Sequence, residues 1–326
     1  MADGLKVIST YQFSRAAREI LREAAQAEVL CIARTDEFLA RLQEAEIVCS
    51  YRMPENWRTL APHLRWLQCS GAGVDGLSPT GILHEDSGVT VTTSAGIHAT
   101  TISEYVFGSM LMFNRNWPEM VHLQDQHVWP RSVNWYNLSG RELVDQTLGI
   151  IGLGNIGRRI AQLGRAFGMN ILATRRSATA EETDPDVDRL YPMAQFHEVL
   201  RHSDYVVLAV PLTGETEKLI SAEELRMMRP NAYLINVARG RVIDQVALIR
   251  ALREQWIAGA GLDVVEEEPL SADSPLFSLP NVILTPHISG ESVHYGERLT
   301  ALFADNLQRY RTGQPLRNRY DPQRGY

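Results

Sequence analysis

Short runs of apolar, mostly β-branched residues alternate with longer amphipathic stretches in the first part of the chain. The longer stretches, at residues 14–26 and 36–44, carry apolar residues at helical spacing. The short runs predict β-strands at Val7-Ile8, 29–32, 47–49, 66–69 and 89–92. Because short strands that alternate with helices are typical of a parallel, doubly wound sheet, we expect an α/β domain here.

A long apolar helix, predicted at residues 100–113, follows this domain. The next segment, residues 114–143, has no regular pattern and contains the large aromatic residues Trp117, Trp129, Trp135 and Tyr136. Aromatic residues on an irregular arm suit a contact between subunits. They suit equally well a surface loop that folds back onto its own domain, and the sequence leaves both interpretations open.

A second alternation of strands and helices begins near residue 148. It predicts helices at 155–167 and 196–201 and strands at 148–151, 171–174, 205–210, 233–237, 258–263 and 282–285. Residues 291–310 have the pattern of an amphipathic helix, and Gly313, Pro315 and Pro322 exclude regular structure after it. The segment therefore predicts a second complete α/β domain.

A glycine-rich motif stands between a predicted strand and a predicted helix of the second domain. It comprises Gly152, Gly154 and Gly157, with Asn155 and Ile156 between the last two glycines. In the context strand, GxGxxG, helix, the first glycine permits a tight turn and the second lets the backbone approach a pyrophosphate. The third glycine packs the helix on the strand, and the helix N-terminus attracts the phosphates. These residues predict a Rossmann dinucleotide-binding domain.

The end of the following strand indicates which dinucleotide is bound. An NAD-binding unit places Asp or Glu there, on the ribose 2′-hydroxyl, whereas this chain has Arg175, 23 residues after Gly152. Thr174, Arg176 and Ser177 flank it. Because guanidinium and hydroxyl groups suit a 2′-phosphate, NADP(H) is favoured over NAD(H). The alternative is that both arginines are solvated surface charges.

Composition and charge narrow the function further. The chain has 326 residues, 44% of them hydrophobic and 22% charged, which is typical of about two globular domains. Its net charge of −7 argues against nucleic acid as a partner. Cys31, Cys49 and Cys69 form neither a disulfide framework nor a metal motif, and no apolar stretch suits a membrane span or a secretory signal. We expect a soluble cytoplasmic protein without a metal.

Three further segments, together with the glycine-rich motif and Gly71–Asp75, resemble the D-isomer-specific 2-hydroxyacid dehydrogenase family. The segments are Asn236–Gly240, Gly261–Leu270 and Thr285–Gly290, and they occur in the family's order over nearly the whole chain. The element Thr174-Arg175-Arg176-Ser177 resembles the NADPH-dependent glyoxylate/hydroxypyruvate reductase branch. The resemblance implies two doubly wound parallel-sheet domains, Rossmann and flavodoxin-like, with a cleft between them. Residues 1–98 and 289–326 would bind substrate, and residues 99–288 would bind the dinucleotide.

The same segments supply the groups that reduction of a 2-keto acid requires. Such a reaction needs a cation for the substrate carboxylate, an acid for the developing alkoxide and a partner for that acid. Arg239 would bind the carboxylate and polarise the keto oxygen, and His287 would deliver the proton. Glu268 would hydrogen-bond the imidazole and keep it charged near neutral pH. An acidic run such as residues 266–268 is otherwise a solvated surface, but the family places the catalytic Glu directly before Pro.

The resemblance also implies contacts outside this triad. Contacts to the cofactor are expected at Val210, Pro211, Val237, Ala238, Asp263, Ser289 and Gly290, and contacts to the substrate at Tyr51, Arg52, Ala72, Gly73, Val74, Arg239 and His287. Asp263 would accept a hydrogen bond from the nicotinamide carboxamide; the alternative is that it caps the end of its strand. In some relatives an aromatic residue of this arm enters the active site of the partner subunit, and the sequence leaves open whether Trp135 does so.

The function implied is reduction of a 2-keto acid to a D-2-hydroxy acid by NADPH, in a homodimer. Glyoxylate or hydroxypyruvate is the expected substrate, and a bulkier 2-keto acid is the alternative. A second alternative, from a different class, is a dinucleotide-binding scaffold of the transcriptional corepressor type, which shares this fold and keeps the triad.

Overall fold

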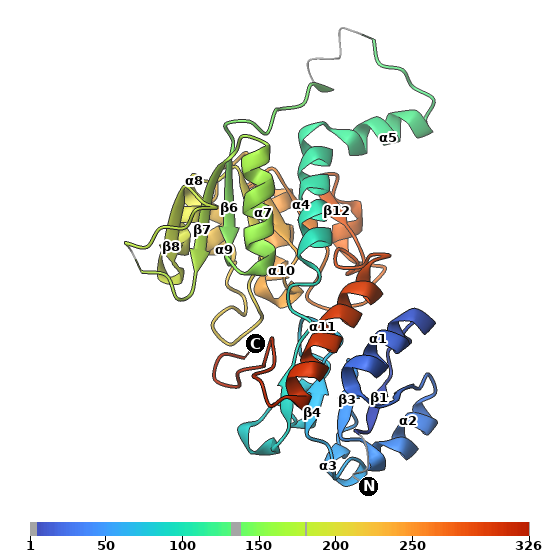
Figure 1. The fold of residues 1–326 in the computed structure, drawn as a ribbon. Coiled ribbons are helices and arrows are strands. Elements are labelled where there is room, and N and C mark those ends of the chain that lie inside the picture. The colour runs from blue at the N-terminus through green and yellow to red at the C-terminus, as the bar shows by residue number, and fades with distance from the viewer. Residues whose placement is uncertain (1–4, 132–137, 180, 326) are drawn as a thin grey trace. The chain divides into compact units, whose positions relative to one another are not determined.

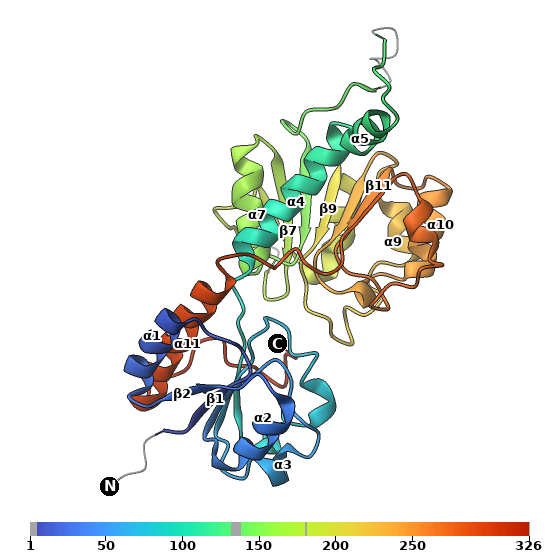
Figure 2. The ribbon, with the colours of Figure 1, turned by 90° about the vertical axis from the view of Figure 1, so that its right-hand side faces the viewer.

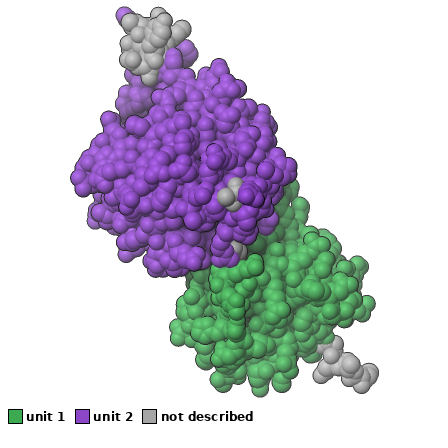
Figure 3. All heavy atoms as spheres, turned by 90° about the vertical axis from the view of Figure 1, so that its left-hand side faces the viewer, with its two compact units in different colours: residues 1–98, 291–326 green, residues 99–290 purple. Residues whose placement is uncertain are grey.

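The structure is a computed structural model that describes residues 5–131, 138–179 and 181–325. The chain forms two compact units, coloured separately in Figure 3. Unit 1 comprises residues 1–98 and 291–326, and unit 2 comprises residues 99–290. Trp135 and Tyr136, two of the aromatic residues expected on the arm, lie outside the described residues.

Unit 1 is built on a five-stranded sheet in which every paired neighbour is parallel. The strand order is β2-β1-β3-β4-β5. The strands are β1 (Val7–Ser9), β2 (Val29–Cys31), β3 (Ile47–Cys49), β4 (Trp66–Gln68) and β5 (Thr90–Thr92). Both faces of this sheet are buried, as in other parallel sheets.

Helices cover both faces of this sheet and complete two apolar cores. The helices are α1 (Arg15–Ala25), α2 (Thr35–Arg41), α3 (Trp57–Leu60) and α11 (Tyr295–Arg311). α1 and α11 pack together on one face, where Leu21, Trp66 and Phe303 are buried (Figure 1). Phe38 and Trp57, from α2 and α3, fill the core on the other face. The C-terminal segment also extends the sheet, because Tyr320 N donates to Val91 O at 2.8 Å.

Unit 2 contains a seven-stranded sheet whose strand pairs are all parallel. The order is β12-β11-β10-β9-β6-β7-β8. The strands are β6 (Thr147–Ile151), β7 (Asn170–Arg175), β8 (Arg189–Pro192), β9 (Tyr205–Leu208), β10 (Tyr233–Asn236), β11 (Gly259–Leu262) and β12 (Val282–Leu284). The chain reverses direction across the sheet at β6, between β7 and β9. Open α/β sheets bind ligands at such a switch point, beyond the carboxyl ends of the strands.

Two layers of helices enclose this sheet. They are α4 (Ala99–Asn114) and α7 (Asn155–Ala166) on one face, and α8 (Phe196–His202), α9 (Ala222–Met227) and α10 (Gln245–Arg253) on the other (Figure 2). Successive residues of β9 enter different cores: Val207 packs with α4 and α7, and Val206 and Leu208 pack with α8 to α10. Burial of both faces explains why this strand is apolar at every position. The two parallel sheets with their helices confirm the predicted α/β class.

Polar residues at the helix starts fix where several helices begin. Ser14 Oγ accepts from Ala17 N at 3.2 Å, and Asp244 caps α10 in the same way. At α9, the Ser221 side chain and Glu224 form a capping box. Such caps satisfy backbone N–H groups that have no partner within the helix.

The segment after α4 differs from the prediction of an irregular arm. It contains the helix α5 (Trp117–Asp125), preceded by Asn116 in the left-handed region at φ 52°. Pro118 stands in the first turn, where its missing N–H costs no hydrogen bond. The hydrophobic pattern does not predict this helix, because none of its residues is buried and it therefore needs no apolar stripe. Within the described residues, no helix is both long and apolar enough to cross a membrane.

Ion pairs anchor α7 to the segment between β7 and β8. Arg158, on α7, donates to both oxygens of Asp184 at 2.9 and 2.8 Å and also pairs with Asp186. The side chain of Asp184 is only 6% exposed. Hydrogen bonds from Arg158 hold the pKa of Asp184 below its ordinary value of 3.8.

This lowered pKa predicts how Asp184→Asn affects stability. A carboxylate whose pKa is lower in the folded state stabilises the fold above the unfolded pKa and loses this effect as pH falls through the folded pKa. We expect Asp184→Asn to lower the free energy of unfolding of unit 2 by about 1–2 kcal/mol at pH 7. In urea unfolding measured over a range of pH, the difference in free energy of unfolding between wild type and variant should decrease only below pH 3.8. An equal effect of Asp273→Asn, at an exposed position, would contradict this assignment.

Candidate active site

The carboxyl edge of the seven-stranded sheet collects most of the residues predicted to carry chemistry. The glycine-rich loop follows β6, and residues 210–211 follow β9. Residues 174–177 comprise the last two residues of β7 and the two that follow them. Arg239 follows β10, Asp263 and Glu268 follow β11, and His287 follows β12. Because all these strands are parallel, their carboxyl ends meet at one edge.

The glycine-rich loop has the geometry that close approach of a phosphate requires. Gly152 has φ 106°, and a Cβ atom there would lie 2.7 Å from Ala209 O. A Cβ atom at Gly157 would lie 2.2 Å from Gly152 O, so only glycine lets α7 start this close to β6. At Gly154 the Cβ position has no atom within 4 Å, which leaves open space beside the backbone.

The start of α7 faces this open space. Gly154 is the N-cap and offers no side chain to the first amides of the helix. Uncapped N–H groups and the positive end of the helix dipole make a binding site for an anion. The loop therefore fits the pyrophosphate of a dinucleotide, with Asn155 and Ile156 at the helix start.

Thr174 holds this loop in place through two hydrogen bonds. It is fully buried, its Oγ1 accepts from Gly152 N at 3.1 Å, and its carbonyl accepts from Leu153 N at 2.7 Å. These two bonds fix the turn between β6 and α7 against the end of β7. The structure thus gives Thr174 a structural function, while its predicted contact with the cofactor stays a prediction.

Arg175, the residue expected at a 2′-phosphate, is held by carboxylates of its own chain. It forms ion pairs with Glu182 and, at 3.3 Å, with Asp184. Its side chain is 25% exposed, and its Nε is buried without a hydrogen-bond partner in the described residues. Arg176 and Ser177 are exposed beside it. Arg175 is therefore an ordered side chain and not a solvated surface charge.

A buried asparagine shapes the turn that carries Arg239. Asn236, fully buried at the end of β10, accepts from Ala238 N at 3.0 Å and donates to Arg239 O at 2.9 Å. The next residue, Gly240, lies so close to the neighbouring loop that its Cβ would be 1.8 Å from Val265 O. The turn with Arg239 is thereby packed against the segment that leads to Glu268. Val210, Val237 and Ala238, predicted cofactor contacts, are nearly buried, and Pro211 is exposed.

His287 and Glu268 form a hydrogen-bonded pair at 2.7 Å between Nδ1 and Oε2. Their side chains are 47% and 36% exposed, so the pair is open to solvent. An ionised carboxylate can only accept, so Nδ1 carries the proton that is shared with Glu268. The second ring nitrogen, Nε2, is then the one that can exchange a proton with a ligand. The other oxygen of Glu268 accepts from Val265 N at 3.2 Å, which orients the carboxylate.

Asp263 holds the turn on which His287 stands. The residue is 2% exposed. Its carboxylate accepts from the backbone N–H groups of Ile288 and Ser289 at 3.0–3.1 Å, and from Thr285 Oγ1 at 2.7 Å. His287 N donates to the Asp263 carbonyl at 2.8 Å, and His287 has φ 55°, in the left-handed region.

This clamp was not predicted from the sequence. Asp263 was expected either to contact the nicotinamide or to cap its own strand end, and the contact with the nicotinamide stays a prediction. Because Asp263 follows β11 and the His287 turn follows β12, spacing in the sequence gives no sign that the carboxylate will accept hydrogen bonds from that turn. A second unforeseen link is Tyr105, whose hydroxyl lies 2.9 Å from Thr285 Oγ1. The pKa of Tyr105 is raised by burial. Near the clamp, Thr101 Oγ1 donates to Gly290 O at 3.2 Å.

The residues expected to bind substrate in unit 1 follow β3 and β4. Tyr51 packs its ring against the loop after β4: a Cβ atom at Gly71 would lie 2.7 Å from the ring, and one at Gly76 would lie 2.7 Å from Tyr51 O. Tyr51 and Arg52 are exposed, and the loop residues Ala72, Gly73 and Val74 are partly exposed. The structure thus brings the two predicted segments of unit 1 together.

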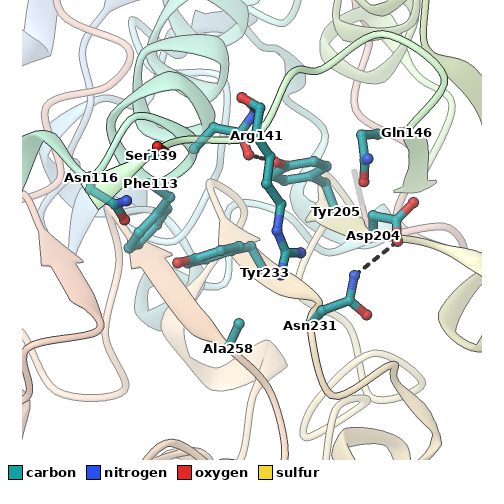
Figure 4. A pocket seen from close by; sticks show the side chains of 11 residues that line it. Phe113, Asn116, Ser139, Arg141, Gln146, Asp204, Tyr205, Asn231, Tyr233 and Ala258 are labelled. Atoms are coloured by element: carbon teal, nitrogen blue, oxygen red, sulfur yellow. Dashed lines mark hydrogen bonds between the residues drawn. The ribbon is translucent and has the colours of Figure 1, made fainter. Parts of the chain in front are cut away.

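A cavity of about 230 Å³ lies at the opposite edge of the seven-stranded sheet, away from these residues. It is lined by residues near the amino ends of the strands, including Asp204, Tyr205 and Tyr233 (Figure 4). Asp204 is bonded there by Arg229 and Asn231. In the part of the chain that the structure describes, no group of three or more His, Cys, Asp or Glu side chains is placed to hold a metal ion.

Comparison with known proteins gives a consistent result. Residues 107–289 match the model of the NAD binding domain of the D-isomer specific 2-hydroxyacid dehydrogenases. A glyoxylate reductase from Pyrococcus furiosus is 38% identical over 260 residues, which cover 78% of this chain and 75% of that protein.

Solved structures resemble the chain over nearly its full length. A D-isomer specific 2-hydroxyacid dehydrogenase family protein from Aeromonas salmonicida has a TM-score of 0.83 at 31% identity and covers 98% of this chain and 100% of its own. An NADPH-dependent glyoxylate/hydroxypyruvate reductase from Sinorhizobium meliloti, solved with NADP and sulfate, has a TM-score of 0.81 at 26% identity. That match covers 99% of this chain and 100% of that protein.

The parallel sheet, the phosphate loop and the matched domain define an oxidoreductase that binds a nicotinamide dinucleotide. The chain belongs to the D-isomer-specific 2-hydroxyacid dehydrogenase family. The resemblance found in the sequence is thereby confirmed, as is its link to the glyoxylate reductases.

The clamp at Asp263 leads to a stability prediction. Asn can keep an acceptor oxygen at the Oδ1 position, where Thr285, Ile288 and Ser289 donate, but it loses the negative charge and places an NH₂ group at the Oδ2 position, opposite the N–H of Ser289. We expect Asp263→Asn to lower the free energy of unfolding by about 1–3 kcal/mol in urea titrations. Thr285→Val, which removes one donor to the same carboxylate, should cost less. If both variants unfold like wild type, the clamp does not stabilise the turn.

Proposed function

We propose that this protein reduces a small 2-keto acid, of the glyoxylate and hydroxypyruvate type, to the D-2-hydroxy acid with NADPH. The observation that carries the proposal is the bond between His287 Nδ1 and Glu268 Oε2, on the same sheet edge as the phosphate loop. The kinship with glyoxylate reductases supports the substrate class.

His287 acts as the general acid in this proposal. With Nδ1 bonded to Glu268, the protonated ring presents Nε2–H to the keto oxygen and donates the proton as negative charge develops there. The carboxylate of Glu268 stabilises the imidazolium and fixes the ring orientation. In the reverse reaction the neutral ring accepts the proton from the hydroxyl group.

Arg239 binds the substrate carboxylate, and its positive charge polarises the keto oxygen. The buried Asn236 holds the backbone of the turn that carries it. A bound nicotinamide dinucleotide would supply the hydride. Residues 72–74 of unit 1 would offer backbone N–H groups to the substrate, with Tyr51 and Arg52 beside them. These assignments agree with those expected from the sequence.

The preference for NADPH rests on Arg175. This position holds a guanidinium where an NAD-binding unit holds a carboxylate, and Arg176 and Ser177 add a second cation and a hydroxyl group. The reductase from Sinorhizobium meliloti is described as NADPH-dependent, which supports the same preference here.

The function is tested by the loss of absorbance at 340 nm with NADPH or NADH and each of glyoxylate, hydroxypyruvate, pyruvate and phenylpyruvate. We expect NADPH oxidation with the smaller acids, and a decrease of kcat by about 10²–10⁴-fold in His287→Ala, because the general acid is lost. Glu268→Gln should also lose activity, while its neighbour Glu267→Gln, at an exposed site, should retain it.

The other outcomes have distinct meanings. If the protein reduces phenylpyruvate and none of the smaller acids, its substrate is a bulkier 2-keto acid. Better turnover with NADH would overturn the cofactor preference and leave the triad intact. Dinucleotide binding without turnover of any acid would favour the scaffold class.

We also propose that the protein forms a homodimer through α5 and the residues after it. Four large apolar side chains are exposed there, namely Trp117 at 51%, Val121 at 54%, Val128 at 47% and Trp129 at 89%. Trp117 and Val121 are four residues apart and so share one face of α5. A cluster of exposed apolar side chains is typical of a surface that another chain covers.

The assembly is tested by sedimentation velocity. Wild type should sediment as a dimer, and Val121→Lys should shift it toward the monomer because a charge enters an apolar interface. Val246→Lys, at a position of α10 that is 78% exposed, is the matched control and should leave the dimer intact. A monomeric wild type would refute the proposal.

A further inference from the structure

The ion pair between Arg175 and Glu182 stands at the end of β7, where the proposed function places the 2′-phosphate of NADPH. Arg175 Nη2 is bonded to Glu182 Oε1, and Arg175 Nη1 lies 3.3 Å from Asp184 Oδ2. Two carboxylates of the chain therefore already use the donors that a phosphate would need.

The two carboxylates are not equivalent. Asp184 is 6% exposed and accepts two hydrogen bonds from Arg158, so its position is fixed whether or not it also pairs with Arg175. Glu182 is 37% exposed, and Arg175 is its one ion-pair partner among the described residues. Moving Glu182 away would expose its carboxylate to water and leave no buried charge behind. The pair is only partly buried, and ion pairs that reach solvent contribute little free energy, so displacing Glu182 costs little.

A phosphate and a carboxylate make the same kind of bond to a guanidinium. Both accept charge-assisted N–H bonds in the same plane, so they compete for one set of donors. The phosphate has the greater charge, at most −2, and should replace the carboxylate. A dinucleotide without the 2′-phosphate offers no such replacement and leaves the ion pair as it is.

We propose that Glu182 is a specificity-determining residue that occupies the 2′-phosphate position on Arg175 until a 2′-phosphorylated nucleotide displaces it. Asp184 keeps the guanidinium in place during the exchange. The proposal rests on the proposed NADPH preference and adds that the chain's own carboxylate weakens binding of the 2′-phosphate. Glu182 thus sets how strongly the two dinucleotides are distinguished.

The test is isothermal titration of the full-length protein with adenosine 2′,5′-bisphosphate and, separately, with adenosine 5′-monophosphate. Glu182→Gln should bind the bisphosphate about three- to tenfold more tightly than wild type, because the competitor is lost. Its affinity for the monophosphate should not change. Glu181→Gln removes the same charge from the adjacent exposed position, and we expect a change of about twofold or less.

The outcomes separate this proposal from the proposed function. If Glu182→Gln behaves like Glu181→Gln, the effect is general charge and the displacement model is wrong. If Glu182→Gln binds the bisphosphate more weakly, Glu182 positions Arg175 and does not compete. Arg175→Gln should lose the preference for the bisphosphate over the monophosphate. If neither wild type nor Glu182→Gln shows such a preference, the NADPH assignment fails, independently of Glu182.

Discussion

The parallel alignment of seven strands, buried on both faces, is the constraint on which the rest of unit 2 depends. It requires the middle of every strand to be apolar, so polar groups stand at or near the strand ends. It also sends every strand to the same edge. Residues as distant in sequence as Gly152 and His287 therefore lie at the same edge, because each follows a strand of the same parallel sheet. The residues proposed to carry the chemistry all lie at or after strand ends, and the sheet determines where those ends lie.

Strand ends are irregular backbone, and buried polar side chains keep them in shape. Thr174 fixes the phosphate loop, Asn236 fixes the turn of Arg239, and Asp263 fixes the turn of His287. All three are at most 2% exposed and satisfy backbone donors that would otherwise be buried without partners. Buried hydrogen bonds thus orient the exposed residues of the site. Those made by Asp263 explain why His287 is stable in a left-handed conformation.

The sequence predicted the parallel sheets and the glycine-rich loop because each has a local signal. Apolar strands, such as β9, and the spacing of Gly152, Gly154 and Gly157 are visible without tertiary structure. The pairing of His287 with Glu268 was also expected, although only through the family resemblance. The helix α5 was missed because it has no buried face. The partners of Arg175 and Asp263 were missed because a side chain's choice among nearby groups depends on distances that spacing in the sequence does not contain.

The composition of unit 1 has a consequence for synthesis. Its core combines Leu21 and Trp66 with Phe303 of α11, and its sheet edge is extended by the segment around Tyr320. The first 98 residues therefore leave the ribosome with one face of their sheet covered by α1 alone, and that core is completed only after all of unit 2 has been translated. Unit 2 is contiguous and can close its cores first. We therefore expect unit 2 to complete its cores before unit 1, and the early strands to be the part of the nascent chain that needs protection from aggregation.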